Sequence, residues 1–516
     1  SQKQEYIYKD SKIIDNLYNS FIIKAVTEEL SDLDNKNNKD NKDEKDENIV
    51  CLSKYLKELN VKYSFVYSGG GNSILRFESK EDGIEFVRGY SLEVLKNYPD
   101  LELYISLVDE SEVEYSSKQE MLIRKRLIEK LDELKDMRKP KFKRLTYGIE
   151  EIGNDGQPID ISQTCKKKPE DFNKKLVRQY LLNKFEKRLI GIATVTANLQ
   201  EYKKDENGKS YIGAISIDGN QMGKMVDKIS NFKDLKDFSK VVDEIYFDAI
   251  IEALKEYKKR TKVDSLIITP VLQAGDDICL IVEAEYAIEI AAGVIKKIEV
   301  ISKMDKYKNM LSKFTELDYL TACGGIAIVR YSYPFFEAVK IAENLCNRAK
   351  ESVYLTNSSD KGYHRKSFID WEIVQSQVNT GIAYEMYVKN QNIKEKYHIK
   401  PLCIDQFKPL EDGIFSYDIF NTLVKNIEEN KELSSSFLEK LKKQIYNGER
   451  QYKLCLDMNK EEKGALRKLM EKAFKDSDNK DNNFYSYMLY YNGKSLIYIL
   501  NDVLEALSFM AKGGSQ

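Results

Sequence analysis

The sequence predicts an α+β fold: two ferredoxin-like β-α-β-β-α-β domains, the first of them degenerate, followed by a C-terminal helical domain. Two apolar segments joined by a glycine-containing tip occur at residues 62–77 and again at 265–284, and this pattern is typical of a β-hairpin. Each hairpin is followed by a helical pattern and then by a further apolar strand. After residue 375 the apolar spacing is helical almost to the end, which predicts the third part.

Within the first domain, the polar, low-complexity stretch Asp32–Asn48 is expected to be a solvated loop. The expected elements, in chain order, are strand Gln4–Tyr8, helices Lys12–Leu30 and Leu52–Leu59, strands Lys62–Tyr67 and Ser73–Phe77, helix Lys80–Tyr98 and strand Leu101–Val108.

The second domain repeats this order with stronger apolar periodicity. Its expected elements are strand Tyr211–Ile217, helix Leu235–Lys259, a hairpin of strands Ser265–Gln273 and Ile278–Ala284, helix Ala287–Ile301, strand Ala322–Val329 and helix Phe335–Val353. The helices expected after it are Tyr417–Glu428, Ser434–Tyr446, Lys460–Phe474 and Ser495–Met510.

These patterns divide the 516 residues into four parts: 1–137, 138–205, 206–375 and 376–516. The second part is a basic linking segment with a charged helix, Ser116–Met137, before it. Its basic run Arg138–Arg144 and basic helix Lys166–Arg188 are more typical of solvated helix faces than of a nucleic-acid contact, although the contact stays open.

Composition narrows the function classes. The net charge is −2, so nucleic-acid binding cannot be argued from overall charge. Seven cysteines, without a C-x-x-C pair, predict a reduced cytoplasmic protein with no structural zinc. The sequence shows no apolar run of membrane-spanning length, so no membrane partner is expected. His364 and His398 are expected at the surface, and a histidine-built metal hydrolase is not expected.

The candidate site is an acidic hairpin tip. Asp276 and Asp277 follow Gly275 between two strands, and Asp218 ends another predicted strand. Glycine and aspartate are also ordinary turn residues, but adjacent carboxylates repel each other, and a bound cation keeps both ionised. The sequence therefore predicts a site for Mg²⁺ or Mn²⁺ formed by Asp218, Asp276 and Asp277.

A glycine-containing loop and helix follow Asp218, and such a layout directs backbone N–H groups and a lysine toward a phosphate. The residues expected to hold a nucleoside triphosphate are Gly219, Asn220, Gly223 and Lys224, with Gly275 and Lys350.

Aligning the two hairpins places Gly71 and Asn72 opposite Asp276 and Asp277. The first copy therefore lacks the carboxylates, although its glycines permit close backbone approach to a ligand. Its tip, Ser68, Gly69, Gly70, Gly71 and Asn72, is either a nucleotide-binding surface or a plain glycine turn, and the sequence does not decide between them.

Taken together, the motifs resemble a known family: the large, cyclase-containing palm subunit of type III CRISPR effector complexes, closer to the Cmr than to the Csm branch. The resemblance covers roughly residues 1–375. It rests on Tyr67–Asn72 with Tyr98–Leu103, Ile217–Lys224, Ala274–Asp277, Gly324–Ile328 with Tyr333-Pro334, and Ala342-Glu343 with Ala349-Lys350.

The resemblance implies that the second domain is a catalytic palm and that the product is cyclic oligoadenylate, made from ATP. It also implies that the partners are other subunits of a Cmr-like complex and, through them, guide RNA and target RNA. Two positions depart from the family pattern: Ala274 replaces a glycine, and Asn220 replaces an aspartate. The family's HD nuclease domain and cysteine-rich zinc segment are not recognised, so DNA cleavage is not expected.

Two alternatives stay open from the sequence. The palm could make a different signal, such as a cyclic dinucleotide or an adenylylated small molecule, which the loss of charge at Asn220 makes conceivable. Alternatively, the chain could be a non-catalytic ATP-binding scaffold, although the intact Asp218, Asp276 and Asp277 argue against decay of the site.

Overall fold

A computed structural model describes residues 63–69, 72–97, 103–113, 116, 118–137, 181–203, 210–263, 265–315, 319–354, 366–374, 394–404, 410–411, 414–474, 482–507 and 509. The chain forms two compact units, which are described separately: residues 1–183 with 223–242, and residues 184–222 with 243–516. The expected elements Gln4–Tyr8, Lys12–Leu30 and Leu52–Leu59 lie outside the described residues, as do the basic run Arg138–Arg144 and residues 166–180 of the basic helix.

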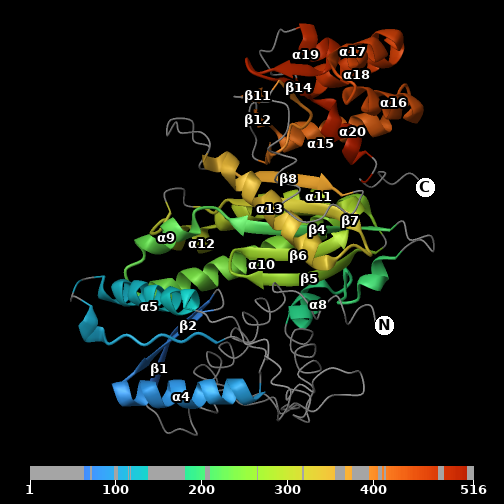
Figure 1. Cartoon of the computed structure of the whole chain (residues 1–516). Coiled ribbons are helices and arrows are strands. Elements are labelled where there is room, and N and C mark those ends of the chain that lie inside the picture. The colour runs from blue at the N-terminus through green and yellow to red at the C-terminus, as the bar shows by residue number, and fades with distance from the viewer. Residues whose placement is uncertain are drawn as a thin grey trace, which may run out of the picture. The chain divides into compact units, whose positions relative to one another are not determined.

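In the first unit the predicted hairpin and both helices are confirmed (Figure 1). Its elements are β1 (Tyr63–Gly69), β2 (Asn72–Phe77), α4 (Lys80–Asn97), the 3-10 turn η1 (Glu110–Glu112), α5 (Gln119–Asp136), α9 (Met222–Lys228) and the start of α10 (Phe232–Thr261). The predicted strand Leu101–Val108 is wrong over its described residues. Ser106 Oγ donates to the Leu127 carbonyl of α5, and Lys130 Nζ of α5 donates to the Leu107 carbonyl, so this segment is bonded to a helix rather than to a strand.

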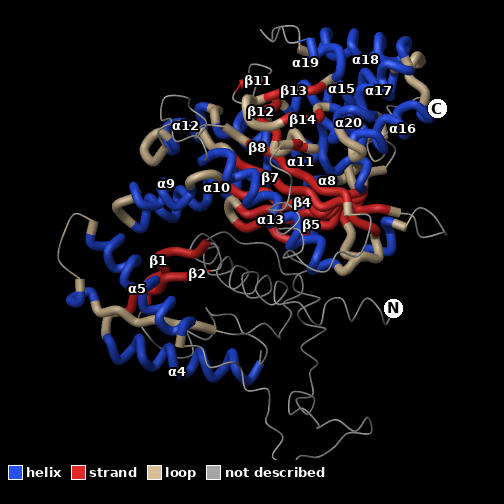
Figure 2. The backbone as a smooth tube through the Cα atoms, turned by 45° about the horizontal axis from the view of Figure 1, so that its top comes forward, coloured by secondary structure: helices blue, strands red, loops and turns tan. Residues whose placement is uncertain are grey.

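The second unit is built around a mixed seven-stranded sheet, drawn in red in Figure 2. Across the sheet the strands are β10 (Leu402–Cys403), β8 (Phe368–Ile373), β7 (Ala322–Arg330), β4 (Tyr211–Gly219), β6 (Asp277–Glu283), β5 (Ile267–Ala274) and β3 (Thr194–Val195). The central strands β7-β4-β6-β5 are antiparallel and are linked through α10 and α11 (Ala284–Ser302). This connectivity follows the predicted β-α-β-β-α-β plan. Two ferredoxin-like domains stay a prediction, because the first copy is described only as a hairpin and its helices.

Helices cover both faces of this sheet. Adjacent residues of a strand point to opposite faces, and Gly324 and Gly325 of β7 show which helix lies on each. A Cβ on Gly324 would meet Ile295 of α11 at 2.9 Å, whereas a Cβ on Gly325 would meet the Ala342 carbonyl oxygen of α13 (Phe335–Tyr354) at 2.1 Å. The lack of a side chain at Gly325 therefore lets the α13 backbone lie directly on the sheet.

The two hairpins share a detail that supports their alignment. Each antiparallel ladder skips one valine, Val66 in β1 and Val271 in β5, three residues before its last paired residue, Gly69 or Ala274. A β-bulge increases the local twist of a hairpin and sets how its tip is directed. The same bulge at the same distance from both tips indicates that the two hairpins are structurally equivalent.

The C-terminal part contains helices and short strands. Its helices are α15 (Tyr417–Glu429), α16 (Ser435–Ile445), α17 (Glu449–Met458), α18 (Lys460–Ala473), α19 (Asn482–Tyr487) and α20 (Leu500–Ala506). Its strands are β9 (Glu395–Lys396), β11 (Leu410–Glu411), β12 (Ile414–Phe415), β13 (Leu489–Tyr491) and β14 (Leu496–Tyr498). The predicted helix Ser495–Met510 is wrong at its start, because Asn492 and Gly493 close a hairpin between β13 and β14.

Two short helices and one 3-10 turn complete the second unit: α8 (Asn183–Leu189), α12 (Asp305–Leu311) and η3 (Leu199–Tyr202). Among the described residues, no helix has both the length and the apolar character needed to span a membrane.

The close approach of α13 to β7 generates a stability prediction. Gly325→Ala should destabilise the protein by about 1–3 kcal/mol or more, because the added methyl group would meet backbone atoms, which cannot rotate away. Gly464→Ala in α18 is the matched control: its Cβ would meet nothing within 4 Å, so it should stabilise by about 0.5–1 kcal/mol. Chemical denaturation of both variants measures the difference, and equal stabilities would show that α13 is not held in this way.

Candidate active site

The predicted carboxylates meet at one end of the central strands. β4 and β6 are antiparallel neighbours, and the ladder between them ends at the pair Ile217 and Ile278. The next step of the same register places Asp218 opposite Asp277, with side chains on one face of the sheet. Gly219, the next residue, faces the other side, where its Cβ would lie 2.9 Å from the Cβ of Asp276. The strand pairing therefore brings Asp218 and Asp277 together, and Asp276, in the turn between β5 and β6, lies close enough for both of their charges to raise its pKa.

A hydrogen-bond network holds the tip between β5 and β6. Ala274 pairs with Asp277, so Gly275 and Asp276 are the two turn residues, and Gly275 has φ +64°. Positive φ at the first turn position is typical of a type II′ turn and favours glycine there. The Gly275 N–H donates to Asp243 Oδ1 at 3.0 Å, and Gln273 Nε2 donates to the same oxygen at 2.9 Å. Ala274 lies in the strand without positive φ, so the departure from the family glycine causes no backbone strain.

Lys350 is the basic residue of the site. Its Nζ donates to Asp218 Oδ2 at 2.5 Å, and both side chains are only partly exposed. Burial alone would lower the pKa of Lys350, but the hydrogen bond and charge of Asp218 outweigh it, and the pKa is raised. Since Lys350 lies on α13, the contact depends on the close helix packing at Gly325.

The remaining carboxylates are difficult to ionise. Burial first, and then the charges of Asp277 and Asp218, raise the pKa of Asp276 to about 7. Burial among neighbouring atoms, and then Asp218, raise the pKa of Asp277 to about 6, even though part of its side chain is open to solvent. When all three are ionised, Lys350 balances one charge and two remain. A divalent cation would balance both, so the residues present fit Mg²⁺ or Mn²⁺.

Two further residues face the carboxylates and were not predicted. Glu343, seven residues before Lys350 and therefore on the same side of α13, adds a negative charge that raises the pKa of Asp277, and its own pKa is raised by burial. Tyr246 on α10 is fully buried, and its hydroxyl would lie 2.7 Å from a Cβ on Gly219. Tyr246 carries no local signal, because only the tertiary fold brings it to the strand ends, whereas Glu343 lies in the Ala342-Glu343 motif of the family resemblance without an assigned role.

The other predicted nucleotide ligands have different surroundings. Asn220 is 2% exposed; its Nδ2 donates to Thr321 Oγ1 at 3.0 Å and to the Lys366 carbonyl at 3.2 Å. Its amide nitrogen therefore anchors the loop after β4. Gly223 and Lys224 lie on α9, which belongs to the other compact unit, so their role stays a prediction.

In the first copy, Ser68 and Gly69 end β1 and Asn72 begins β2, whereas Gly70 and Gly71 lie outside the described residues. Nucleotide binding at this tip also stays a prediction.

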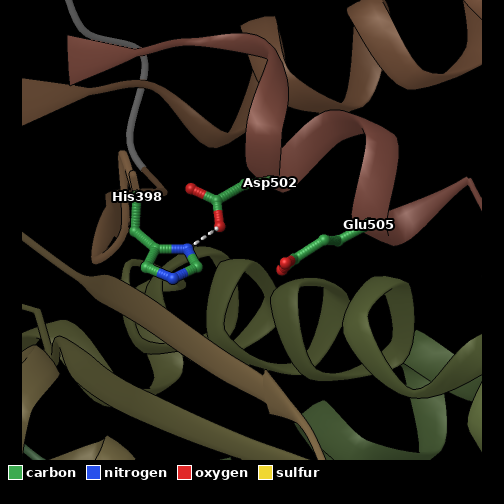
Figure 3. Close-up of side chains that lie close together, drawn as sticks. All are labelled: His398, Asp502 and Glu505. Carbon is green, nitrogen blue, oxygen red and sulfur yellow. Dashed lines mark hydrogen bonds and ion pairs between the residues drawn. The ribbon is translucent and has the colours of Figure 1, made fainter. Parts of the chain in front are cut away.

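A second ionisable cluster lies in the C-terminal part (Figure 3). His398, predicted at the surface, is mostly buried; its Nδ1 lies 2.7 Å from Asp502 Oδ1, with Glu505 nearby. The prediction failed because the partner is 104 positions away in sequence and reaches His398 only through α20. The Ile399 N–H also donates to Asp502 Oδ2 at 2.6 Å.

Lys400 provides the positive charge that balances Asp502 in this cluster. Its ammonium, almost completely buried, lies 3.4 Å from Asp502 Oδ1 and donates to the Trp371 carbonyl at 2.6 Å. Burial would raise the pKa of Asp502, but the charges of Lys400 and His398 lower it to about 2. Lys400 thus supplies the cation, and the cluster joins α20 to β8 as a buried ionic network.

Among the described residues, only His398, Asp502 and Glu505 form a group of three whose ligand atoms all lie within 4.8 Å of one another. Asp218, Asp276 and Asp277 are spaced more widely.

Comparison with known proteins supports the resemblance drawn from the motifs. Residues 211–355 match the family described as Cas10/Cmr2, second palm domain. Over 268 residues the chain is 21% identical to the CRISPR system Cmr subunit Cmr2 of Pyrococcus furiosus. That match covers 47% of this chain and only 29% of the relative's length. The chain is thus Cas10/Cmr2-like, and the predicted resemblance to a type III subunit is confirmed.

Solved structures of Csm1 are also similar, at low identity. Csm1 of T. onnurineus has a TM-score of 0.46 and 13% identity, with 88% of this chain and 64% of that chain covered. A Csm1–Csm4 cassette in complex with cA4 has a TM-score of 0.41 and 14% identity, with 94% and 62% covered. A cassette in complex with AMPPNP has a TM-score of 0.46 and 14% identity, with 98% and 68% covered. At these scores the likeness does not establish a shared site.

The raised pKa of Asp276 generates a pH prediction. The folded protein keeps a proton on Asp276 that the unfolded chain loses near pH 3.8, so stability without metal should fall as pH rises from about 4 to about 7. The side chain of Asp276→Asn cannot ionise, so the variant should not lose stability in this way as pH rises. At pH 7.5 in chelator the variant should be more stable than wild type, on the order of 1–2 kcal/mol after allowance for solvent screening.

Thermal unfolding between pH 5 and 8 measures this difference, and excess Mg²⁺ should reduce it by stabilising only the wild type. A variant that follows the wild-type curve at every pH would show that Asp276 ionises freely.

Proposed function

We propose that this chain is a metal-dependent nucleotidyltransferase that converts ATP into cyclic oligoadenylate as a subunit of a type III CRISPR effector complex. One observation carries the proposal: three carboxylates, opposed by a single lysine, meet at the strand ends of a region that matches the Cas10/Cmr2 second palm domain. Carboxylates that repel each other but are held together by the fold are suited to binding cations.

Asp218, Asp276 and Asp277 would hold Mg²⁺ or Mn²⁺. When bound, the cation supplies positive charge that lowers the pKa of a ribose 3′-hydroxyl and stabilises charge on the phosphates. The protein's own contribution is positioning. The II′ turn fixes Asp276 and Asp277 relative to each other, and the β4–β6 ladder fixes Asp218 opposite them.

Lys350 has two roles in this proposal. Without a cation, its ammonium neutralises Asp218. With a cation bound at Asp218, Lys350 would be free to contact the oxygens of the triphosphate, where its charge would stabilise the leaving pyrophosphate. Gly219, Gly223 and Lys224, with Asn220 and Gly275, would complete the phosphate-binding surface.

The first copy is proposed to hold the second nucleotide. Its hairpin is equivalent to the catalytic one, including the bulge, but its tip from Ser68 to Asn72 has no carboxylate. A glycine-rich tip permits close backbone approach to a ligand without binding a metal. The partners are proposed to be other subunits of a Cmr-like complex, with guide and target RNA. The match covers less than a third of the curated relative's length, so the activity and the partners of the whole complex are proposals for this chain.

The direct test incubates the protein with ATP and Mg²⁺, with and without guide and target RNA, and identifies products by mass spectrometry. Cyclic oligoadenylate is the expected product, whereas a cyclic dinucleotide or another adenylylated product would support the alternative palm chemistry. Asp277→Asn should reduce product by more than the about 10–100-fold typical for residues that only support metal ligands.

Asp305→Asn, which changes an exposed carboxylate in the first turn of α12, is the matched control and should retain activity. ATP binding without any product under all conditions would favour the scaffold interpretation.

A further inference from the structure

The hydroxyl group of Tyr246 has no role that the packing of the fold explains. Its ring and hydroxyl are fully buried in the middle of α10, and the hydroxyl has no hydrogen-bond partner among the described residues. A buried hydroxyl without a partner is costly, and a phenylalanine would fill the same space without that cost. The hydroxyl therefore indicates a partner that this arrangement of side chains does not provide.

The position of Gly219 shows where the hydroxyl points. The Cβ that Gly219 lacks would lie 2.7 Å from Tyr246 Oη and 2.9 Å from the Cβ of Asp276. The hydroxyl and Asp276 thus border the same small space, on the face of the sheet opposite Lys350. The Asp276 carboxylate extends about one to two bond lengths beyond its Cβ, which places its oxygens within reach of the hydroxyl after rotation about χ1 or χ2.

The surrounding charges keep the hydroxyl a donor. Burial first, and then the charges of Asp276, Asp218 and Asp277 in that order, raise the pKa of Tyr246 well above 10. The phenol therefore stays protonated at neutral pH and can donate to an ionised carboxylate.

We propose that Tyr246 is a positioning residue of the metal site, whose hydroxyl donates to the ionised Asp276 carboxylate and fixes which oxygen faces the cation. The inference rests on the proposed function. Lys350 contacts Asp218 from α13, and Tyr246 supports Asp276 from α10, so the two helices hold the carboxylates from opposite faces. Carboxylates that bind metals are commonly oriented by hydrogen bonds of this kind.

Tyr246→Phe removes only the hydroxyl, and Mn²⁺ binding measures its effect without any turnover. Electron paramagnetic resonance of free Mn²⁺ in a titration gives the dissociation constant. The variant should bind Mn²⁺ about 10–100-fold more weakly than wild type, with the midpoint of its pH dependence moved to higher pH. In chelator its melting temperature should equal or exceed that of wild type, because an unpaired buried hydroxyl is lost.

Tyr257→Phe is the matched control. Tyr257 lies on the same helix, is 4% exposed and also has a buried hydroxyl without a partner among the described residues. Its pKa is raised first by burial and then by Glu289, away from the three carboxylates. The control should bind Mn²⁺ as wild type does.

Three outcomes separate the two proposals. Weaker Mn²⁺ binding by Tyr246→Phe alone supports the inference. Wild-type affinity in Tyr246→Phe, while Asp276→Asn loses binding, overturns the inference and leaves the metal site intact. No Mn²⁺ binding by the wild-type protein overturns both the inference and the proposed metal-dependent function.

Discussion

Repulsion among the carboxylates of Asp218, Asp276 and Asp277 is the constraint that the packing at the strand ends of the second unit must overcome. The β4–β6 register places Asp218 opposite Asp277, and the II′ turn adds Asp276 at the same end of the strands, so the backbone holds the three charges near one another. Burial first, and then the charges of the neighbouring carboxylates, raise the pKa of Asp276 to about 7 and that of Asp277 to about 6. Such a site is destabilising without a cation, and it persists because the surrounding sheet and helices fix it.

Packing on both faces of the sheet holds the carboxylates in place at the strand ends. Gly325 lets α13 lie on the sheet, which brings Lys350 to Asp218. On the other face, Gly219 leaves room between Asp276 and the hydroxyl of Tyr246. Asp243 holds the N–H of Gly275 and so fixes the tip itself. A side chain at Gly325 would displace α13, and a side chain at Gly219 would displace Asp276. Both strand positions therefore require glycine.

The local sequence pattern predicted the three carboxylates of the site but not all of the residues around them. Asp218, Asp276 and Asp277 follow from a strand end and a Gly-Asp-Asp turn, and the structure brings them together. The contributions of Asp243 and Tyr246 could not be predicted, because on a helix they resemble ordinary core or surface residues. Glu343 belongs to a motif of the family resemblance, but the sequence assigned it no role. The same limit applies to strands β8, β10 and β3, which extend the predicted sheet, and to the buried partner of His398. The hairpin at Asn492-Gly493 did carry a local signal, but the helical spacing of the neighbouring apolar residues obscured it.

Proton release on metal binding tests the central claim most directly. Because Asp276 and Asp277 hold protons near neutral pH, a cation that binds all three carboxylates must displace them. Calorimetric titration with Mn²⁺ in buffers of different ionisation enthalpy counts these protons. The account predicts about one proton released per ion at pH 6 and almost none at pH 8, with the release at pH 6 reduced in Asp276→Asn. Tight Mn²⁺ binding at pH 6 without proton release would contradict it.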